Sequence, residues 1–272
     1  MKTLISGVLS AGLLVATGAW AADAEQAGKS ADAQQRGLEI AREADRRGSG
    51  FNDMQADLRM VLISKRGDTS ERELEMRVLE GTGEKEGDKS LILFQSPPDV
   101  RGTALLTWSY KERDDDQWLY LPALRRVKTI ASKNKSGPFM GSEFAYEDMR
   151  PQEVEKYTYK YLRTEDCRDQ KCFVVERYPV SEYSGYTKQV SWIDTEEYRT
   201  FKVEYYDRKK SHLKTLRNTG FKHHEDEWWR PSKMSMKNHQ TGKGTDLFWE
   251  NYRFDTGLGE ADFSRNSLKR AR

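Results

Sequence analysis

From residue 54 onward, apolar and polar side chains alternate with a period of two along one short segment after another. In one of them, Leu74, Met76 and Val78 alternate with charged residues. Because successive side chains of a strand point to opposite faces, this pattern predicts half-buried β-strands. Short polar connections join the segments, and no helical stretch of 10–15 residues lies between them. We therefore expect an antiparallel sheet and exclude a parallel α/β fold.

A helix is predicted before the strands, over about 32–47, where Leu38 and Ala41 share one face and Gly48-Ser49-Gly50 ends the pattern. A last short helix is expected near 260–270. The predicted strands lie between these helices, near 54–62, 73–78, 90–94, 103–110, 117–121, 125–131, 154–163, 172–178, 187–194, 199–207, 212–221, 228–237 and 245–254.

The first 21 residues have the pattern of a secretory signal peptide. Lys2 is followed by an uncharged apolar run over 4–17, and Ala19-Trp20-Ala21 fits the small-x-small cleavage rule, so cleavage is expected after Ala21. An uncleaved membrane anchor is disfavoured because the run is short for a span. We predict a periplasmic protein with a signal peptide at 1–21, a segment with an amphipathic helix at 22–53, and a β domain at 54–272 that forms one domain with this helix.

The two cysteines, Cys167 and Cys172, are separated by four polar residues and flanked by predicted strands. An exported protein meets an oxidising environment, so a disulfide across a hairpin loop is expected. Free thiols or a zinc site are the alternatives, but further zinc ligands are missing nearby.

The charge composition excludes several classes of protein. Charged residues make up 33% of the chain, yet 46 basic residues nearly balance 44 acidic ones. A dedicated nucleic-acid binder would carry a basic excess, and a disordered chain would have few aromatic residues. Repeated apolar runs of about 20 residues, as in a multi-span membrane protein, are also missing.

Several predicted strands are apolar on both faces. In Trp118-Leu119-Tyr120-Leu121, both alternating sets are large, which a sheet with one wet face should not show. Either the sheet is covered on both sides, as in a sandwich or under helices, or it is curved around an apolar cavity that helices plug.

The most specific linear pattern lies within residues 116–149 and consists of the segments 118–127, 139–142 and 146–149. It resembles the LolA-like outer-membrane lipoprotein-sorting family, and most closely the branch found beside efflux-type (RND/MMPL) permeases. The resemblance implies a mostly β fold with a few helices, in which an incomplete antiparallel β-barrel covers helices and an apolar cavity. In well-studied carriers of this family, a cavity-facing arginine locks the lid, a role that we assign to neither Arg125 nor Arg126.

The resemblance also implies a function. We predict a monomeric carrier that binds lipid or lipoprotein acyl chains, acting in lipoprotein sorting or as an accessory to an inner-membrane RND/MMPL-type permease. It needs no catalytic residue, cofactor, metal or nucleic acid. A periplasmic sensor with the same fold is the alternative, and an enzyme comes third.

Large apolar residues on the predicted strands and in the segment 139–144 are the candidates for lipid contact, although ordinary core packing explains each equally well. They are Leu106, Trp108, Trp118, Tyr120, Phe139, Met140, Phe144, Met234, Met236 and Phe248. A basic stretch with Arg125, Arg126 and Lys128 could dock to anionic head groups or an acidic partner, or be a solvated strand face.

The stretch His223-His224-Glu225-Asp226-Glu227 is the best candidate for a metal site. Adjacent histidines on a strand point to opposite faces, however, and cannot easily bind one ion. A polar hairpin turn before Trp228 is the better interpretation.

Overall fold

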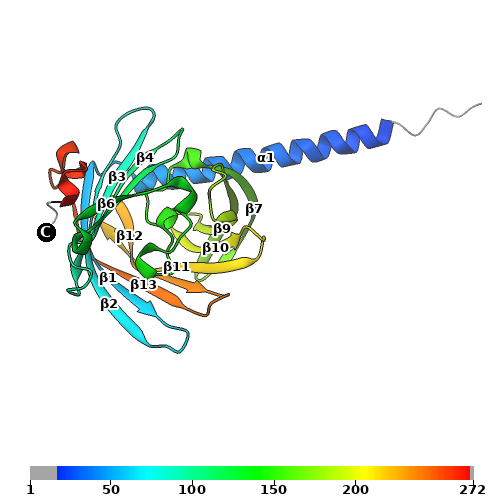
Figure 1. Cartoon of the computed structure of the whole chain (residues 1–272). Coiled ribbons are helices and arrows are strands. Elements are labelled where there is room, and N and C mark those ends of the chain that lie inside the picture. The colour runs from blue at the N-terminus through cyan, green and yellow to red at the C-terminus, as the bar shows by residue number, and fades with distance from the viewer. Residues whose placement is uncertain (1–16, 270–272) are drawn as a thin grey trace, which may run out of the picture.

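One curved antiparallel sheet dominates the computed structural model, which describes residues 17–269 and side chains from Gly28 onward. Its 13 strands follow the order β6-β5-β4-β3-β2-β1-β13-β12-β11-β10-β9-β8-β7 and form an incomplete barrel (Figure 1). All the predicted strands are confirmed, with ends that shift by a few residues. They are β1 (Asp53–Ile63), β2 (Thr69–Leu79), β3 (Glu86–Ser96), β4 (Ala104–Tyr110), β5 (Asp116–Leu121), β6 (Arg126–Ile130), β7 (Tyr157–Cys167), β8 (Gln170–Pro179), β9 (Tyr186–Asp194), β10 (Thr200–Asp207), β11 (His212–His224), β12 (Trp228–Asn238) and β13 (Gly244–Phe254).

The two edge strands, β6 and β7, follow one another in the sequence. Their connection, residues 131–156, therefore has to cross the open side of the barrel, and we call it the plug. It carries four short 3-10 turns: η2 (Ser132–Asn134), η3 (Phe139–Gly141), η4 (Tyr146–Asp148) and η5 (Val154–Lys156).

Helix α1 (Thr17–Gly48) packs its C-terminal part against β7 and extends away from the sheet at its N-terminal end (Figure 1). It begins earlier than the predicted helix. The approach is close at Gly37, where an added Cβ would lie 2.7 Å from the backbone nitrogen of Tyr161, so that only glycine fits. Of the expected signal peptide, residues 1–16 lie outside the described residues. No described helix is long and apolar enough to cross a membrane.

Strands β3 to β5 are buried on both faces. On the concave face, Phe94 and Leu105 pack with Phe139 of the plug. On the convex face, Leu106 and Trp118 pack under the C-terminal turns η6 (Glu260–Phe263) and η7 (Ser267–Lys269), which replace the predicted last helix. The doubly apolar strands are thus explained by cover on both faces; the sheet is curved, but the concave face of these strands is packed against the plug and does not line the cavity.

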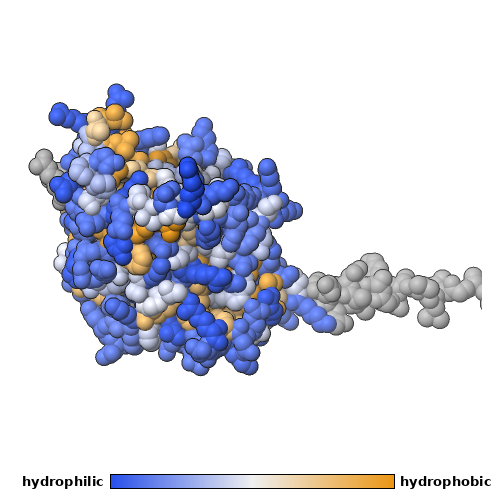
Figure 2. Space-filling model, turned by 90° about the horizontal axis from the view of Figure 1, so that it is seen from below, coloured by the Kyte–Doolittle hydropathy of each residue, from blue (hydrophilic) through white to orange (hydrophobic). Residues whose placement is uncertain are grey.

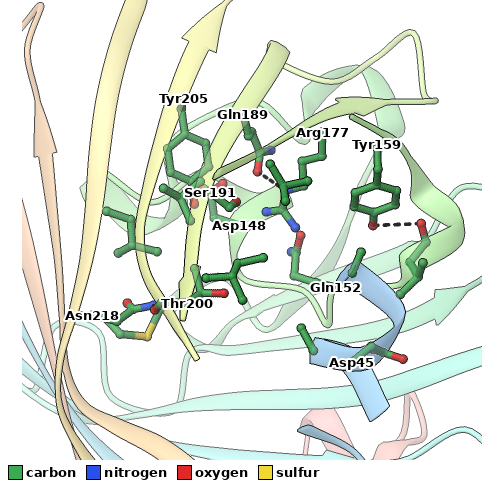
Figure 3. A pocket seen from close by; sticks show the side chains of 18 of the residues that line it. Asp45, Asp148, Gln152, Tyr159, Arg177, Gln189, Ser191, Thr200, Tyr205 and Asn218 are labelled. Atoms are coloured by element: carbon green, nitrogen blue, oxygen red, sulfur yellow. Dashed lines mark hydrogen bonds between the residues drawn. The ribbon is translucent and has the colours of Figure 1, made fainter. Parts of the chain in front are cut away.

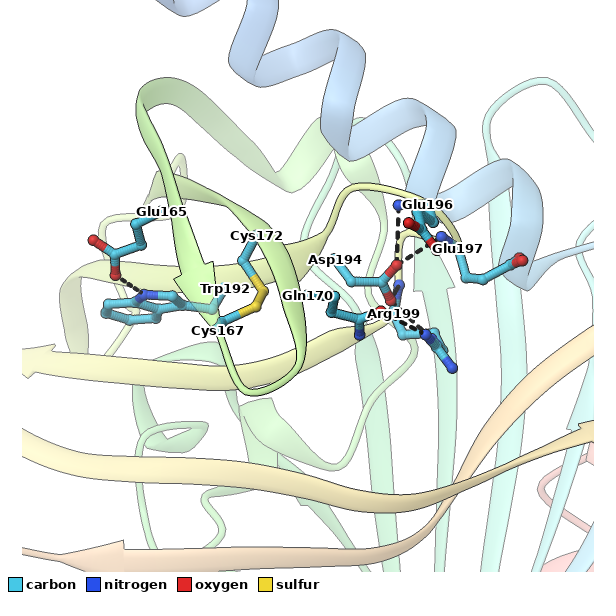
Figure 4. Close-up of a disulfide and its surroundings, with 9 residues drawn as sticks. All are labelled: Glu165, Cys167, Gln170, Cys172, Trp192, Asp194, Glu196, Glu197 and Arg199. Atoms are coloured by element: carbon cyan, nitrogen blue, oxygen red, sulfur yellow. Dashed lines mark hydrogen bonds and ion pairs between the residues drawn. A yellow bond between two sulfur atoms is a disulfide. The ribbon is translucent and has the colours of Figure 1, made fainter.

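The predicted disulfide is confirmed and fixes one end of the sheet (Figure 4). Cys167 and Cys172 join β7 to β8 with a Cα–Cα distance of 5.7 Å, so the free-thiol and zinc alternatives are wrong. Nearby, the fully buried Asp194 carboxylate accepts hydrogen bonds from the backbone amides of Glu196 and Glu197 and is paired with Arg199 at 2.8 Å. These bonds hold the turn between β9 and β10.

Candidate functional site

Strand register brings the concave-facing side chains of β7 to β12 into rows that run across the sheet. The row nearest the plug is polar, and the next, two residues further along each strand, is mostly apolar. The polar row consists of Tyr159, Arg177, Gln189, Tyr205, Lys214 and Asn238, and the apolar row of Val175, Ser191, Val203, Leu216 and Met236.

A cavity of about 310 Å³ lies between these rows, the end of α1 and the plug (Figure 3). This volume is at the lower end of pockets that bind small molecules, roughly 300–1,000 Å³. Its walls are mostly apolar on one side, where Ser191, Thr200 and Asn218 are the polar exceptions, and polar on the other. The apolar wall includes Ala41, Ala44, Phe144, Val154, Val175, Val203, Leu216 and Met234, and the polar wall includes Asp148, Gln152, Arg177 and Gln189.

The acidic motif of the plug anchors it to β9 and β11. The Asp148 carboxylate lies 2.7 Å from Lys214 Nζ, and both side chains are buried. It also accepts hydrogen bonds from the Tyr186 hydroxyl at 2.9 Å and the Ala145 backbone amide at 2.7 Å. A buried ion pair is stable only when such extra donors satisfy its remaining oxygens, and here all of them come from the plug or the adjacent strands.

Glu147 makes a second anchor. Its carboxylate accepts hydrogen bonds from the Ser184 hydroxyl and the Gly185 backbone amide, both at 2.7 Å. Burial raises the pKa of Glu147, and the neighbouring Asp148 adds to the shift. The motif 146–149, which was singled out by resemblance, therefore positions the plug.

The other side of the plug is held by β2 and β3. Phe139 is fully buried, with ring centroids 5.7 Å from Phe94 and 5.6 Å from Tyr146. Arg72 of β2 donates a hydrogen bond to the backbone carbonyl of Met140, a non-glycine residue with a positive φ of 49°. Burial lowers the pKa of Arg72.

Arg72 is a residue that the sequence analysis missed. Its signal was present, because Arg72 shares the alternation of Leu74 and Met76 and so places a cation on the face expected to be apolar. Arg125 and Arg126, by contrast, are exposed at the edge of the sheet and do not reach the plug.

Phe144 separates the cavity from a second hollow. It lines the cavity and also a hollow of about 670 Å³ on the other side of the plug, and its side chain is buried. Lys214 lines this second hollow, while its partner Asp148 lines the cavity. Phe144 is therefore the side chain between the interior and the outer hollow.

The candidate lipid contacts fall on two different faces. Phe139, Met140, Phe144, Met234 and Met236 belong to the concave core, and of these Phe144 and Met234 line the cavity. The other five do not line the cavity, which corrects the prediction: the inward residues are Leu105 on β4, Leu119 on β5 and Leu247 on β13, and the five candidates point to the convex face. Leu106, Trp108, Trp118 and Tyr120 pack under the C-terminal turns, and Phe248 lies between Arg59 and Lys233 on the convex face.

The basic candidates lie elsewhere. Arg125, Arg126 and Lys128 are exposed on the β5–β6 turn and on β6, next to Leu124, which is 63% exposed. Their side chains have no hydrogen-bond or ion-pair partner in the described part of the chain. Figure 2 shows apolar groups at a few places on an otherwise hydrophilic face.

The histidine stretch forms the predicted hairpin turn. His223 and His224 end β11, and β12 begins at Trp228. His223 stacks on Trp229 with ring centroids 4.6 Å apart, whereas His224 lies 4.9 Å from Tyr252. Among residues 17–269, no group of three His, Cys, Asp or Glu side chains could hold a metal ion.

Comparison with known proteins gives consistent relatives. A family model described as an uncharacterized protein matches residues 86–270. An outer-membrane lipoprotein-sorting protein domain from Vibrio parahaemolyticus is 50% identical with a TM-score of 0.84, covering 87% of this chain and 99% of that one. No curated protein matches the chain.

Two further structures are similar. A DUF1329 family protein from Desulfovibrio piger is 29% identical with a TM-score of 0.82, and the match covers 87% of this chain and 99% of that one. A LolA superfamily protein from Nitrosomonas europaea is 19% identical with a TM-score of 0.68, covering 84% and 97%. At this identity, the last comparison shows the fold alone.

Proposed function

Because the chain belongs to the LolA-like family of outer-membrane lipoprotein-sorting proteins, we propose that it is a periplasmic carrier of lipid or lipoprotein acyl chains. The observation that carries the proposal is the cavity of about 310 Å³, with one apolar wall and a plug across its opening. The proposed mature protein begins after Ala21, and its activity includes no catalytic step and no cofactor.

Burial alone supplies the affinity in this proposal. Each CH₂ group of an acyl chain that leaves water stabilises the complex by about 0.8 kcal/mol. A chain with ten such groups against Val175, Val203 and Leu216 would therefore gain about 8 kcal/mol before the costs of association. No covalent chemistry is needed to hold such a cargo or to release it.

Loading requires part of the plug to move. Asp148 and Glu147 hold the segment 145–149 through several buried bonds to β9 and β11. The Phe139 ring is buried, and Glu143 is bonded to Thr245 and Asn238. Between them, only Arg72 among the described residues hydrogen-bonds to the backbone of Met140. We propose that this bond is the releasable latch and that the acyl chain enters past Phe144.

Lipid uptake by a cavity-filling variant tests the proposal. Ser191→Phe adds a ring to the cavity wall and should abolish uptake of a fluorescent acyl lipid and its transfer between vesicles. Trp118→Phe, on the covered convex face, is the matched control and should leave uptake unchanged. Native mass spectrometry of protein from the periplasm should show a co-purifying lipid. If the delipidated protein takes up no lipid, the carrier function is refuted.

Docking remains a separate proposal. Leu124 with Arg125, Arg126 and Lys128 forms an apolar tip with three cations, which fits a surface of anionic lipid. Replacing the three cations by glutamine should reduce cosedimentation with vesicles containing phosphatidylglycerol, and salt should reduce it for the unaltered protein. Binding that is unchanged in this variant would exclude the site.

The partner is also a proposal. We propose an inner-membrane permease of the RND/MMPL type, and crosslinking in the periplasm followed by identification of the captured membrane protein tests it. Capture of a signalling membrane protein instead would favour the sensor function.

A further inference from the structure

One cation in the cavity wall has no protein anion. Arg177 of β8 is partly buried, and its Nε donates a hydrogen bond to Gln189 Oε1 at 2.7 Å. Its guanidinium carbon lies 4.5 Å from the centroid of the Tyr157 ring. Within residues 28–269, it forms no ion pair and its two terminal nitrogens have no acceptor. Since a half-buried cation is stabilised by a partner anion, this donor pair is suited to a ligand.

The two acids of the cavity wall do not neutralise Arg177. Asp148 is paired with Lys214 and accepts bonds from Tyr186 and Ala145. Asp45 of α1 is exposed to solvent and forms no ion pair with Arg177 within the described residues. Neither acid is therefore bound to the Arg177 guanidinium, which stays open to a ligand anion.

A second donor lies in the same row. Tyr205 pairs with Gln189 across the strands, and Gln189 pairs with Arg177. The Tyr205 side chain is buried and lines the cavity, and its hydroxyl has no hydrogen-bond partner in the described part of the chain. Figure 3 shows Arg177 and Tyr205 on the sheet side of the cavity. Both can donate to one acceptor group between them.

We propose that the cavity selects single-chain amphiphiles with an anionic head group, a carboxylate or a phosphate ester, which Arg177 and Tyr205 bind. The tail then lies across Val203 and Leu216 toward Met234. The space for the tail can be measured along β11. Lys214, in the polar row, is four residues from Asn218 at the far end of the cavity, a distance of about 13 Å at 3.3 Å per residue. This selectivity rests on the proposed carrier function.

Calorimetric titration with three probes of equal chain length tests the head-group selectivity: decanoate, decyl phosphate and decanol at pH 8. The unaltered protein should bind both anions about tenfold or more tightly than decanol, as expected for a charge-assisted hydrogen bond. Arg177→Gln should lose this preference while keeping the affinity for decanol, and Arg177→Lys should keep part of it. Arg163→Gln, which removes an exposed cation of β7, is the matched control and should change nothing.

The outcomes separate the two proposals. If no probe binds to the unaltered protein, the carrier function itself is refuted. If decanol binds as tightly as decanoate, or if Arg177→Gln retains the preference for the anions, the proposed head-group selectivity is wrong. The cavity would then bind acyl chains whatever their head group. A loss of all binding by folded Arg177→Gln, checked by circular dichroism, would equally overturn the anionic selectivity. If only one of the two anions is preferred, the class narrows to a carboxylate or a phosphate ester.

Discussion

The two halves of the sheet share one fold pattern but differ in what fills their concave side. In the filled half, β2 to β6, the inward residues Ile92, Phe94 and Leu105 are fully buried against the plug. In the hollow half, β7 to β12, Arg177 and Gln189 occupy the corresponding inward positions. Apolar side chains can close-pack against the plug, whereas a row of hydrogen-bonding groups keeps space between them. The difference indicates that the filled half has a structural role, whereas the hollow half provides the binding cavity.

The largest expected effect is where the plug packs against the filled half. Phe139→Ala should lower the free energy of unfolding by about 3–5 kcal/mol, because the removed ring leaves a cavity among fully buried neighbours. Met234→Ala, which borders existing space, should cost about 2 kcal/mol. Denaturant titration measures the free energy of unfolding of the two variants. Equal losses of stability would show that the two halves do not differ in packing.

A nearly equal effect is expected where the plug meets the hollow half. Asp148→Asn leaves the buried Lys214 ammonium without its anion and should cost about 3 kcal/mol. Combining it with Lys214→Met removes the unpaired charge, so the double variant should recover much of the stability. A double variant as unstable as the sum of the two single variants would show that the pair is not coupled.

The disulfide gives a smaller effect confined to the hollow half. Replacing Cys167 and Cys172 by serine opens a short loop and should cost about 2 kcal/mol in the chain-entropy model. Thermal unfolding measures this loss. Lipid uptake should stay unchanged because neither cysteine lines the cavity; impaired uptake would show that this end of the sheet shapes the site.

The last effect depends on pH and concerns the contact between β3 and the plug. Burial raises the pKa of Asp88 to about 7, and the nearby Glu153 carboxylate adds to the shift. Because the folded state holds this proton more tightly than the unfolded chain, stability should fall as the pH rises from about 4 to about 7 and then level off. Asp88→Asn should remove this part of the slope and be more stable than the unaltered protein at pH 8. An unchanged pH profile in the variant would contradict the assignment.

The strands, the hairpin turns and the disulfide could be predicted because each depends on residues close together in the sequence. The inward face could not be predicted for β4 and β5, since Leu105 and Leu106 are both apolar and alternation alone does not distinguish their faces. Phe263 and Leu268, which cover the second face, lie more than 140 residues away in the sequence.

The polar row was missed for a related reason. Arg177, Gln189 and Tyr205 belong to three strands, and only strand register brings them together. In the sequence, each is an ordinary polar or aromatic residue of an alternating strand. Arg72 was more accessible to prediction, because it interrupts an apolar alternation within a single segment.

The pairing of β1 with β13 has a consequence for how the protein folds. These strands are the first and last of the sheet, yet they lie side by side at its centre. Residues such as Leu58 and Trp249 must therefore meet across almost the whole chain, a contact of very high sequence separation. The hairpins of either half can form from residues close together in the sequence, but the two halves join into one sheet only when β13, which ends at residue 254, is available. Closure of the sheet at its centre therefore has to wait until nearly the whole chain is available.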